Sequence, residues 1–125
     1  MRELLTFDIC QMEIYDNHII TTVNEGIHLT SDDNNILIEV AEKFFSDSKF
    51  VYISNRINSY SLDPKVYYET FKVKNLLGLA IVSSNHKALG NAKIERLFFK
   101  KPYKIFSDMK EALLWTDELV SNSPN

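Results

Sequence analysis

The chain has 125 residues, of which 45% are apolar and 25% are charged, as in a globular domain of ordinary size. Its formal charge of −3 gives no overall field that would direct it to nucleic acid or a membrane surface. Cys10 is the single cysteine, which excludes an intrachain disulfide and a cysteine-based metal cluster. We expect one cytoplasmic domain over 1–120, a flexible polar tail over 121–125, and neither a signal peptide nor a membrane span.

The first part of the chain predicts a β-hairpin followed by a helix. Residues 6–15 alternate between apolar and polar side chains, and residues 18–23 are rich in β-branched ones. Asp16-Asn17 between them suits a tight turn. The capping residues at 30–33 begin a helix that is expected to run to about Asp47. An exposed edge of the hairpin offers a route to dimerisation.

The remainder of the chain alternates strands and helices. Short apolar strands are predicted over 50–54, 79–83 and 103–106, and helices over 64–75, 87–100 and 108–120. The third helix carries an apolar stripe of Ile94, Leu97 and Phe98. This order predicts an α/β fold: an N-terminal β-hairpin, then alternating β and α, in a four- to five-stranded mixed sheet flanked by helices.

Two polar loops follow neighbouring strands in this prediction. Ligands of open α/β sheets bind outside the carboxyl ends of the parallel strands, so the two loops are expected to face one mouth. The positive charge and forked guanidinium of Arg56, with nearby helix N-termini, favour a phosphate or carboxylate. The alternative is a pair of solvated turns. The candidate residues are Ser54, Asn55, Arg56, Asn58, Ser59, Tyr60, Ser61, Ser83, Ser84, Asn85 and His86.

The sequence shows no spacing typical of an enzyme or a metal site. There is no phosphate-binding glycine loop, nucleophile elbow or paired-carboxylate motif, so no catalytic residue, metal or cofactor is predicted. His86 with Ser54 or Ser83 is the one pairing to check in a structure. A basic end to the third helix complements the helix dipole, and nucleic-acid binding is not expected. It contains Lys93, Arg96, Lys100, Lys101 and Lys104.

The last quarter of the chain carries a family resemblance. The element order and the stretch KPYKIFSDMKEALLWTDEL resemble STAS-like proteins of the bacterial anti-sigma-factor antagonist, or SpoIIAA-like, superfamily. The matching residues are Lys101, Pro102, Phe106, Asp108, Glu111, Ala112 and Trp115. The resemblance implies a sheet flanked by helices and a partner kinase or anti-sigma factor.

The resemblance also implies a switch by phosphorylation at the start of the helix after the third strand. The usual Asp-Ser-Ser-Gly signature is replaced by Ser54-Asn55-Arg56-Ile57, which leaves Ser59 and Ser61 as candidate acceptors by position. A divergent branch of the class resembles lipid carriers, for which Tyr67, Phe71, Phe98 and Phe99 are candidate pocket residues or ordinary core.

Two functions follow as hypotheses. The first is a non-enzymatic regulatory protein–protein interaction module that uses the loop after the third strand. There, Arg56→Ala is expected to weaken partner binding and leave the fold intact. The alternative is a carrier or sensor of a small, lipid-like apolar ligand held in an internal pocket.

Overall fold

The centre of the fold is a six-stranded mixed sheet. A computed structural model describes residues 1–85 and 92–124. The strands lie in the order β1-β2-β3-β5-β7-β8, and the last four are mutually parallel. This confirms the α/β class and the hairpin of β2 and β3, which pair antiparallel. The strands are β1 (Glu3–Thr6), β2 (Cys10–Ile14), β3 (His18–Val23), β5 (Phe50–Asn55), β7 (Leu76–Val82) and β8 (Tyr103–Phe106).

The sheet has one strand more than the upper number expected, because residues 3–6, for which no separate strand was predicted, form β1, while the predicted strand over 6–15 is present only as β2. The backbone N–H of Phe7 donates to the carbonyl of Cys10 at 2.8 Å, which closes a turn and lets β1 fold back antiparallel onto β2. β1 therefore covers the hairpin edge that was expected to be available for dimerisation. The outer edges of the sheet belong instead to β1 and β8.

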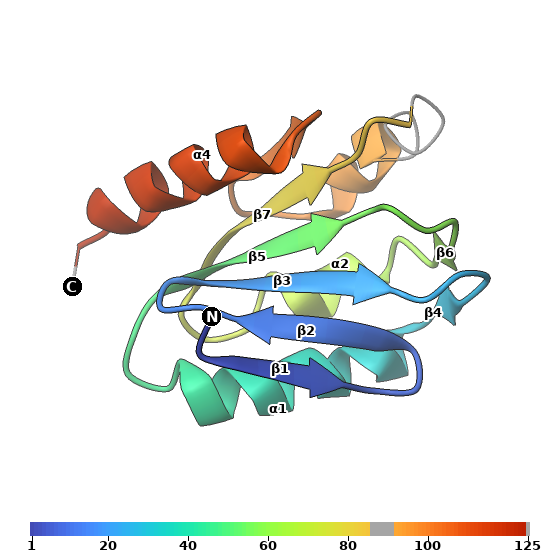
Figure 1. The fold of residues 1–125 in the computed structure, drawn as a ribbon, viewed down its shortest axis with the longest axis horizontal. Helices are drawn as coiled ribbons and strands as arrows, with labels where there is room; N and C mark the ends of the chain where they lie inside the picture. The colour runs from blue at the N-terminus through green and yellow to red at the C-terminus, as the bar shows by residue number, and fades with distance from the viewer. Residues whose placement is uncertain (86–91, 125) are drawn as a thin grey trace.

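The helices cover the two faces of the sheet unequally (Figure 1). One face packs against α1 (Asn34–Phe44), which follows the short 3-10 helix η1 (Ser31–Asp33), and against α2 (Val66–Thr70). α4 (Met109–Ser121) covers the other face over β5, β7 and β8. Between β7 and β8 the chain is helical over 92–95 and continues into the 3-10 helix η2 (Arg96–Phe98); we call 92–98 the helical segment.

The second helix is shorter than its sequence pattern predicts. We expected a helix over 64–75, but α2 ends at Thr70 and β7 begins at Leu76. Asn75 adopts a left-handed backbone with φ of 69°, and its side chain donates to the carbonyl of Phe45 at 2.6 Å. Asn tolerates this conformation better than most residues, so it ends the turn and starts β7 early.

A small parallel pair of strands organises the long loop after β5. β4 (His28–Leu29) pairs with β6 (Ser61–Leu62), two residues each, within stretches that carry no strand pattern. This pair lies at the end of the sheet toward which the arrows of β3, β5 and β7 point (Figure 1). The carboxyl ends of the parallel strands thus meet the loop at one edge.

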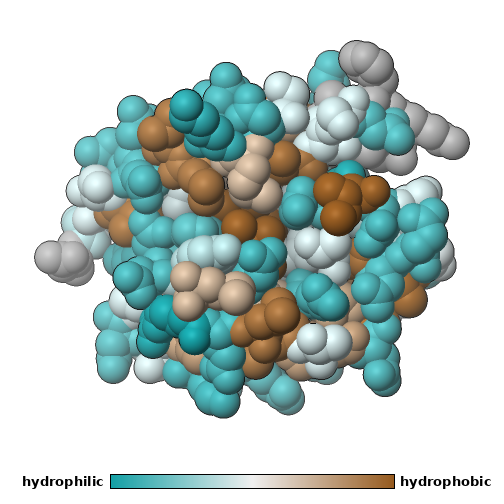
Figure 2. All heavy atoms as spheres, in the orientation of Figure 1, coloured by the Kyte–Doolittle hydropathy of each residue, from teal (hydrophilic) through white to brown (hydrophobic). Residues whose placement is uncertain are grey.

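Two apolar cores hold these layers together. Between the sheet and α1 and α2 the core includes Met12, Leu37 and Phe50, while under α4 it includes Ile53 and Ala112. In the view of Figure 2, apolar side chains reach the surface in separate groups among hydrophilic ones. Among the described residues, no helix has the length and apolarity needed to cross a membrane.

Close packing of α4 on the sheet makes Gly78 sensitive to substitution. A Cβ atom there would lie 2.9 Å from Leu119 Cδ2 and 2.9 Å from the carbonyl oxygen of Pro102. We expect Gly78→Ala to lower the free energy of unfolding by about 1–3 kcal/mol, as overpacking does, measured by urea denaturation. Gly26→Asn is the control, because space there is open and Asn tolerates its positive φ. Equal stability of the Gly78 variant and the wild type would contradict this packing.

Candidate functional site

A cleft of about 1110 Å³ opens at the carboxyl ends of the parallel strands. It is lined by both predicted loops, the one after β5 and the one after β7, and by Ser107 and Asp108 at the start of α4. The structure therefore brings most of the candidate residues to one mouth. Those that line it are Asn55, Arg56, Asn58, Ser59, Tyr60, Ser61, Ser83, Ser84 and Asn85.

Among the described candidates, Ser54 lies outside the cleft lining. Ser54 is buried beneath it, with its hydroxyl group 3.1 Å from the Tyr60 hydroxyl. His86 lies outside the described residues, so the pairing of His86 with Ser54 or Ser83 has no structural description. At the start of α4, Asp108 accepts from the N–H of Glu111 at 2.8 Å and caps its own helix, as its sequence position predicted.

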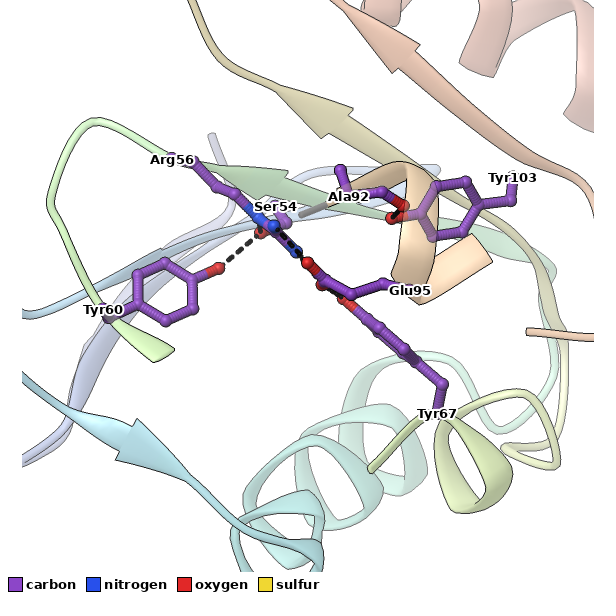
Figure 3. A network of polar contacts seen from close by, with 7 residues as sticks. All are labelled: Ser54, Arg56, Tyr60, Tyr67, Ala92, Glu95 and Tyr103. Carbon is purple, nitrogen blue, oxygen red and sulfur yellow. Dashed lines mark hydrogen bonds and ion pairs between the residues drawn. The ribbon is translucent and has the colours of Figure 1, made fainter. Parts of the chain in front are cut away.

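The floor of the cleft is a buried ion pair between Arg56 and Glu95 (Figure 3). Two guanidinium nitrogens of Arg56 donate to the two carboxylate oxygens of Glu95 at 2.8 and 2.6 Å. The same guanidinium group donates to the Tyr67 hydroxyl at 2.9 Å, and that hydroxyl donates to Glu95 at 2.6 Å. The side chains of the pair are only 6% and 7% exposed.

Burial and charge act in opposite directions on this cluster. Desolvation alone would lower the pKa of Arg56, but its hydrogen bonds with Glu95 and the nearby tyrosines raise it above its ordinary value. Desolvation raises the pKa of Tyr67 well above its usual range. Arg56 thus stays charged and Tyr67 stays a neutral hydrogen-bond donor. The forked guanidinium expected to bind an anion already binds a carboxylate of the same chain.

Glu95 also sets the rotation of the helical segment. Ala92, Glu95 and Phe99 face inward, with exposures of 0%, 5% and 5%. The predicted apolar stripe is wrong on this point, because Ile94 and Leu97 face outward, 58% and 72% exposed. A helix can bury only one side here, and the ion pair selects the side that carries Glu95.

The sequence analysis did not select Glu95 as a site residue, and it selected Tyr67 only for a lipid pocket and not for the cleft. Glu95 lies 39 positions from Arg56, and Tyr67 lies on an ordinary-looking amphipathic helix. The one local signal is a carboxylate inside a run of apolar residues, Ile94 to Phe99. That signal identifies a position worth checking, but it does not identify the partner.

The loop after β5 is fastened to the turn that follows β3. The N–H of Ser59 donates to the Glu25 carboxylate at 2.7 Å, and the carbonyl of Ser59 accepts from the N–H of Gly26 at 2.7 Å. Asn58 donates to the carbonyl of Val23 at 3.0 Å. These contacts order the loop backbone and leave the tip residue Ile57 72% exposed.

Ser61 lies beside a histidine that the sequence analysis did not connect with it. The Ser61 hydroxyl is 2.7 Å from His28 Nδ1, and both residues are exposed. A serine nucleophile also needs an orienting group for the base and an oxyanion site. In the described part of the chain His28 has no second hydrogen-bond partner. Residues 1–85 and 92–124 thus show a serine–histidine contact but no assembled catalytic triad. Metal chemistry finds no support either, since no group of three or more metal-binding side chains occurs among the described residues.

A separate internal cavity of about 60 Å³ lies between the sheet and helices α1 and α2. Its lining is mainly apolar but includes Cys10, Thr21 and Tyr52. Burial raises the pKa of Tyr52, and burial with nearby Asp33 raises the pKa of Cys10 to about 11, so both groups stay neutral at neutral pH. Thr21 approaches Tyr52, yet its hydroxyl completes no hydrogen bond with the described residues.

The cavity differs from the pocket suggested by the lipid-carrier resemblance. Tyr67 contributes to its lining. Phe71, Phe98 and Phe99 lie outside the lining and pack instead on neighbouring aromatic rings. Phe71 and Phe99 are ordinary packing residues in this structure, whereas Phe98 is half-buried and packs on Tyr68.

The hairpin, the parallel strands and the flanking helices together define a SpoIIAA-like fold, as the resemblance implied. A solved structure with this fold is similar: an uncharacterised protein from the DUF3478 family of Shewanella loihica PV-4. It has a TM-score of 0.54 and 17% identity, over 86% of this chain and 91% of that one. At this identity the likeness is one of fold. No protein-family model and no curated protein matches the sequence.

Burial of the ion pair changes the expectation for Arg56→Ala. Removing the cation leaves Glu95 buried without its partner, which destabilises a protein by about 3–5 kcal/mol, so the variant should be markedly less stable and not, as first expected, unaffected in its fold. We expect this loss in urea denaturation of Arg56→Ala. The double variant Arg56→Met, Glu95→Leu should recover most of it, because apolar replacements of a buried pair are often neutral. Additive losses in the double variant would show that the two residues act independently.

Proposed function

We propose that this chain is a non-enzymatic, cytoplasmic regulatory module that binds a partner protein in the cleft at the carboxyl ends of its parallel strands. The observation that carries the proposal is the pair of exposed apolar side chains, Ile57 and Ile94, in a lining rich in hydrogen-bonding groups. Apolar anchors surrounded by polar groups are characteristic of protein interfaces. The SpoIIAA-like fold is compatible with such a role.

Charge in the cleft favours a particular kind of partner. The described acidic and basic residues in its lining are Glu25, Arg56, Glu95 and Asp108. Arg56 and Glu95 neutralise each other, which leaves the two carboxylates at Glu25 and Asp108. A partner segment with an apolar side chain and basic residues complements this lining, and its binding should weaken with salt.

Phosphorylation at Ser59 or Ser61 would act on the same surface. Either site would add about −1.5 to −2 charges, which strengthens the attraction for a basic partner and repels an acidic one. A phosphate on Ser61 would lie next to the ring of His28. In this proposal Arg56 supports the floor of the cleft, and the loop tip and rim contact the partner.

The second candidate function is binding of a small ligand in the internal cavity. The specific observation in its favour is the unsatisfied hydroxyl of Thr21 in an otherwise mainly apolar lining. A volume of about 60 Å³ is well below the roughly 150 Å³ of a cavity that holds benzene. The ligand in this proposal is therefore a small neutral molecule with one hydrogen-bonding group, and a lipid chain is too large for the cavity as it stands.

The partner proposal predicts that Ile57 is a major contact. We expect Ile57→Gln to weaken partner binding about ten-fold, as loss of an apolar anchor does, without loss of stability. A pull-down from native cell extract with intact-mass analysis would identify the partner, and calorimetry at two salt concentrations would measure the affinity. Leu114→Gln is the matched control, an exposed leucine on α4 outside the cleft lining. Equal recovery of the partner with both variants would overturn the proposal.

The cavity proposal predicts that two buried threonines behave differently. Thr116 is fully buried and lies outside the cavity lining. Its hydroxyl, like that of Thr21, has no hydrogen-bond partner among the described residues. We expect Thr116→Val to stabilise the protein by about 1 kcal/mol, because an unsatisfied buried hydroxyl is unfavourable. Thr21→Val should stabilise the protein by less than this, because it also removes the polar group that water or a ligand can contact.

Ligand binding itself gives the second readout. Native mass spectrometry of freshly purified protein should show an added mass, and titration with 1-propanol should give saturable NMR shifts at methyl groups of the cavity. Thr21→Val should abolish the saturable NMR shifts, and Thr116→Val should preserve them. If Thr21→Val and Thr116→Val stabilise the protein equally, and the wild type shows no saturable NMR shift, the cavity is not a ligand site.

A further inference from the structure

The outward-facing side of the helical segment is an unusual surface. Leu97 is 72% exposed, although leucine is normally placed in the core of a domain this size. The rotation set by Glu95 explains why Leu97 is not buried. It does not explain why an apolar residue, and not a polar one, occupies that exposed position.

Three exposed cations lie close to this leucine in the chain, and one of them, Arg96, also contacts Tyr103 through its guanidinium group. Lys93, Arg96 and Lys100 lie four residues before, one residue before and three residues after Leu97. The one acid in the segment, Glu95, faces inward and is neutralised by Arg56. The surface therefore has a local charge of +3 on a chain whose net charge is −3. A net charge of −3 is therefore compatible with a local cluster of positive charge on this surface.

Aromatic side chains extend the apolar part of the surface onto α2. The rings of Tyr68 and Phe98 meet edge to face with centroids 5.5 Å apart, and Tyr68 is 43% exposed. The neighbouring charges on α2, Lys72 and Glu69, form an ion pair at 3.6 Å and add no net charge. We call Tyr68, Lys93, Arg96, Leu97, Phe98 and Lys100 the basic–apolar surface.

We propose that the basic–apolar surface docks the protein on an anionic phospholipid bilayer. Leu97 belongs to the lining of neither the cleft nor the internal cavity, so it projects from the surface. Protein hot spots fill pockets, whereas a bilayer interface accepts a projecting leucine and aromatic rings while its head groups contact the flanking cations. Each cation near an anionic leaflet strengthens binding roughly five-fold at low salt, so docking is reversible and salt-sensitive.

This inference is independent of the partner proposed for the cleft, although the two sites adjoin. Ile94, in the same helical segment, lines the cleft. A bilayer bound through Leu97 would thus lie beside the cleft. Docking would then concentrate the module near partners at a membrane surface.

Vesicle co-sedimentation tests the proposal directly. At low salt we expect the wild type to bind phosphatidylcholine vesicles that contain roughly one part in four of phosphatidylglycerol. At high salt it should dissociate from them, and it should not bind vesicles of pure phosphatidylcholine. Leu97→Gln should weaken binding at least five-fold, and the triple variant Lys93→Gln, Arg96→Gln, Lys100→Gln should abolish it. Circular dichroism should show that the fold of each variant is unchanged.

The control replaces an exposed leucine and an exposed lysine on another face of the protein. Leu114 is 60% exposed on α4 and Lys110 is exposed on the same helix, so Leu114→Gln with Lys110→Gln should leave vesicle binding unchanged. Ile57→Gln should also leave it unchanged, which separates this test from that of the cleft. The proposal is overturned if the wild type fails to bind anionic vesicles, or if the control pair weakens binding as much as Leu97→Gln does. It is equally overturned if substitutions in this surface leave vesicle binding unchanged and instead abolish binding of an acidic protein or self-association.

Discussion

The ion pair between Arg56 and Glu95 determines more of this structure than any other contact. It joins the end of β5 to the helical segment before β8, and through Tyr67 it reaches α2. Two buried charges each lose several kcal/mol of hydration, and this loss is offset only when the geometry is good and the remaining donors and acceptors are satisfied. Here both carboxylate oxygens are hydrogen bonded, which meets that condition.

Rotation of the helical segment shows how such a pair competes with hydrophobic burial. Burying Ile94 and Leu97 would each contribute about 1.5–3 kcal/mol, which favours the orientation predicted from their spacing. The observed orientation buries Ala92 and Phe99 instead and avoids an unpaired buried Arg56, which would cost about 3–5 kcal/mol. Burial of Ala92 and Phe99 offsets part of the loss at Ile94 and Leu97, and the ion pair then favours the observed orientation.

Local patterns predicted the parts of the fold that depend on local physics. Alternation and β-branched runs predicted the hairpin and the parallel strands, and Ser107-Asp108 predicted the cap of α4. The positions of Ser59 and Ser84 in one cleft followed from the rule for carboxyl ends of parallel strands. The pairing of Arg56 with Glu95 could not be predicted, because it joins residues 39 positions apart and leaves no periodic signal in either segment.

The same pair changes how the cleft can select a ligand. An arginine at the end of a β-strand, free of other contacts, would make this mouth a site for anions. Since Glu95 occupies two nitrogens of the fork, the ion pair carries no net charge, and in the proposed function the partner is selected at the rim. The rim offers Ile57 as an apolar contact and the carboxylates of Glu25 and Asp108. A shared fold at 17% identity therefore does not transfer a binding chemistry, since one internal carboxylate is enough to turn an anion-binding floor into a structural one.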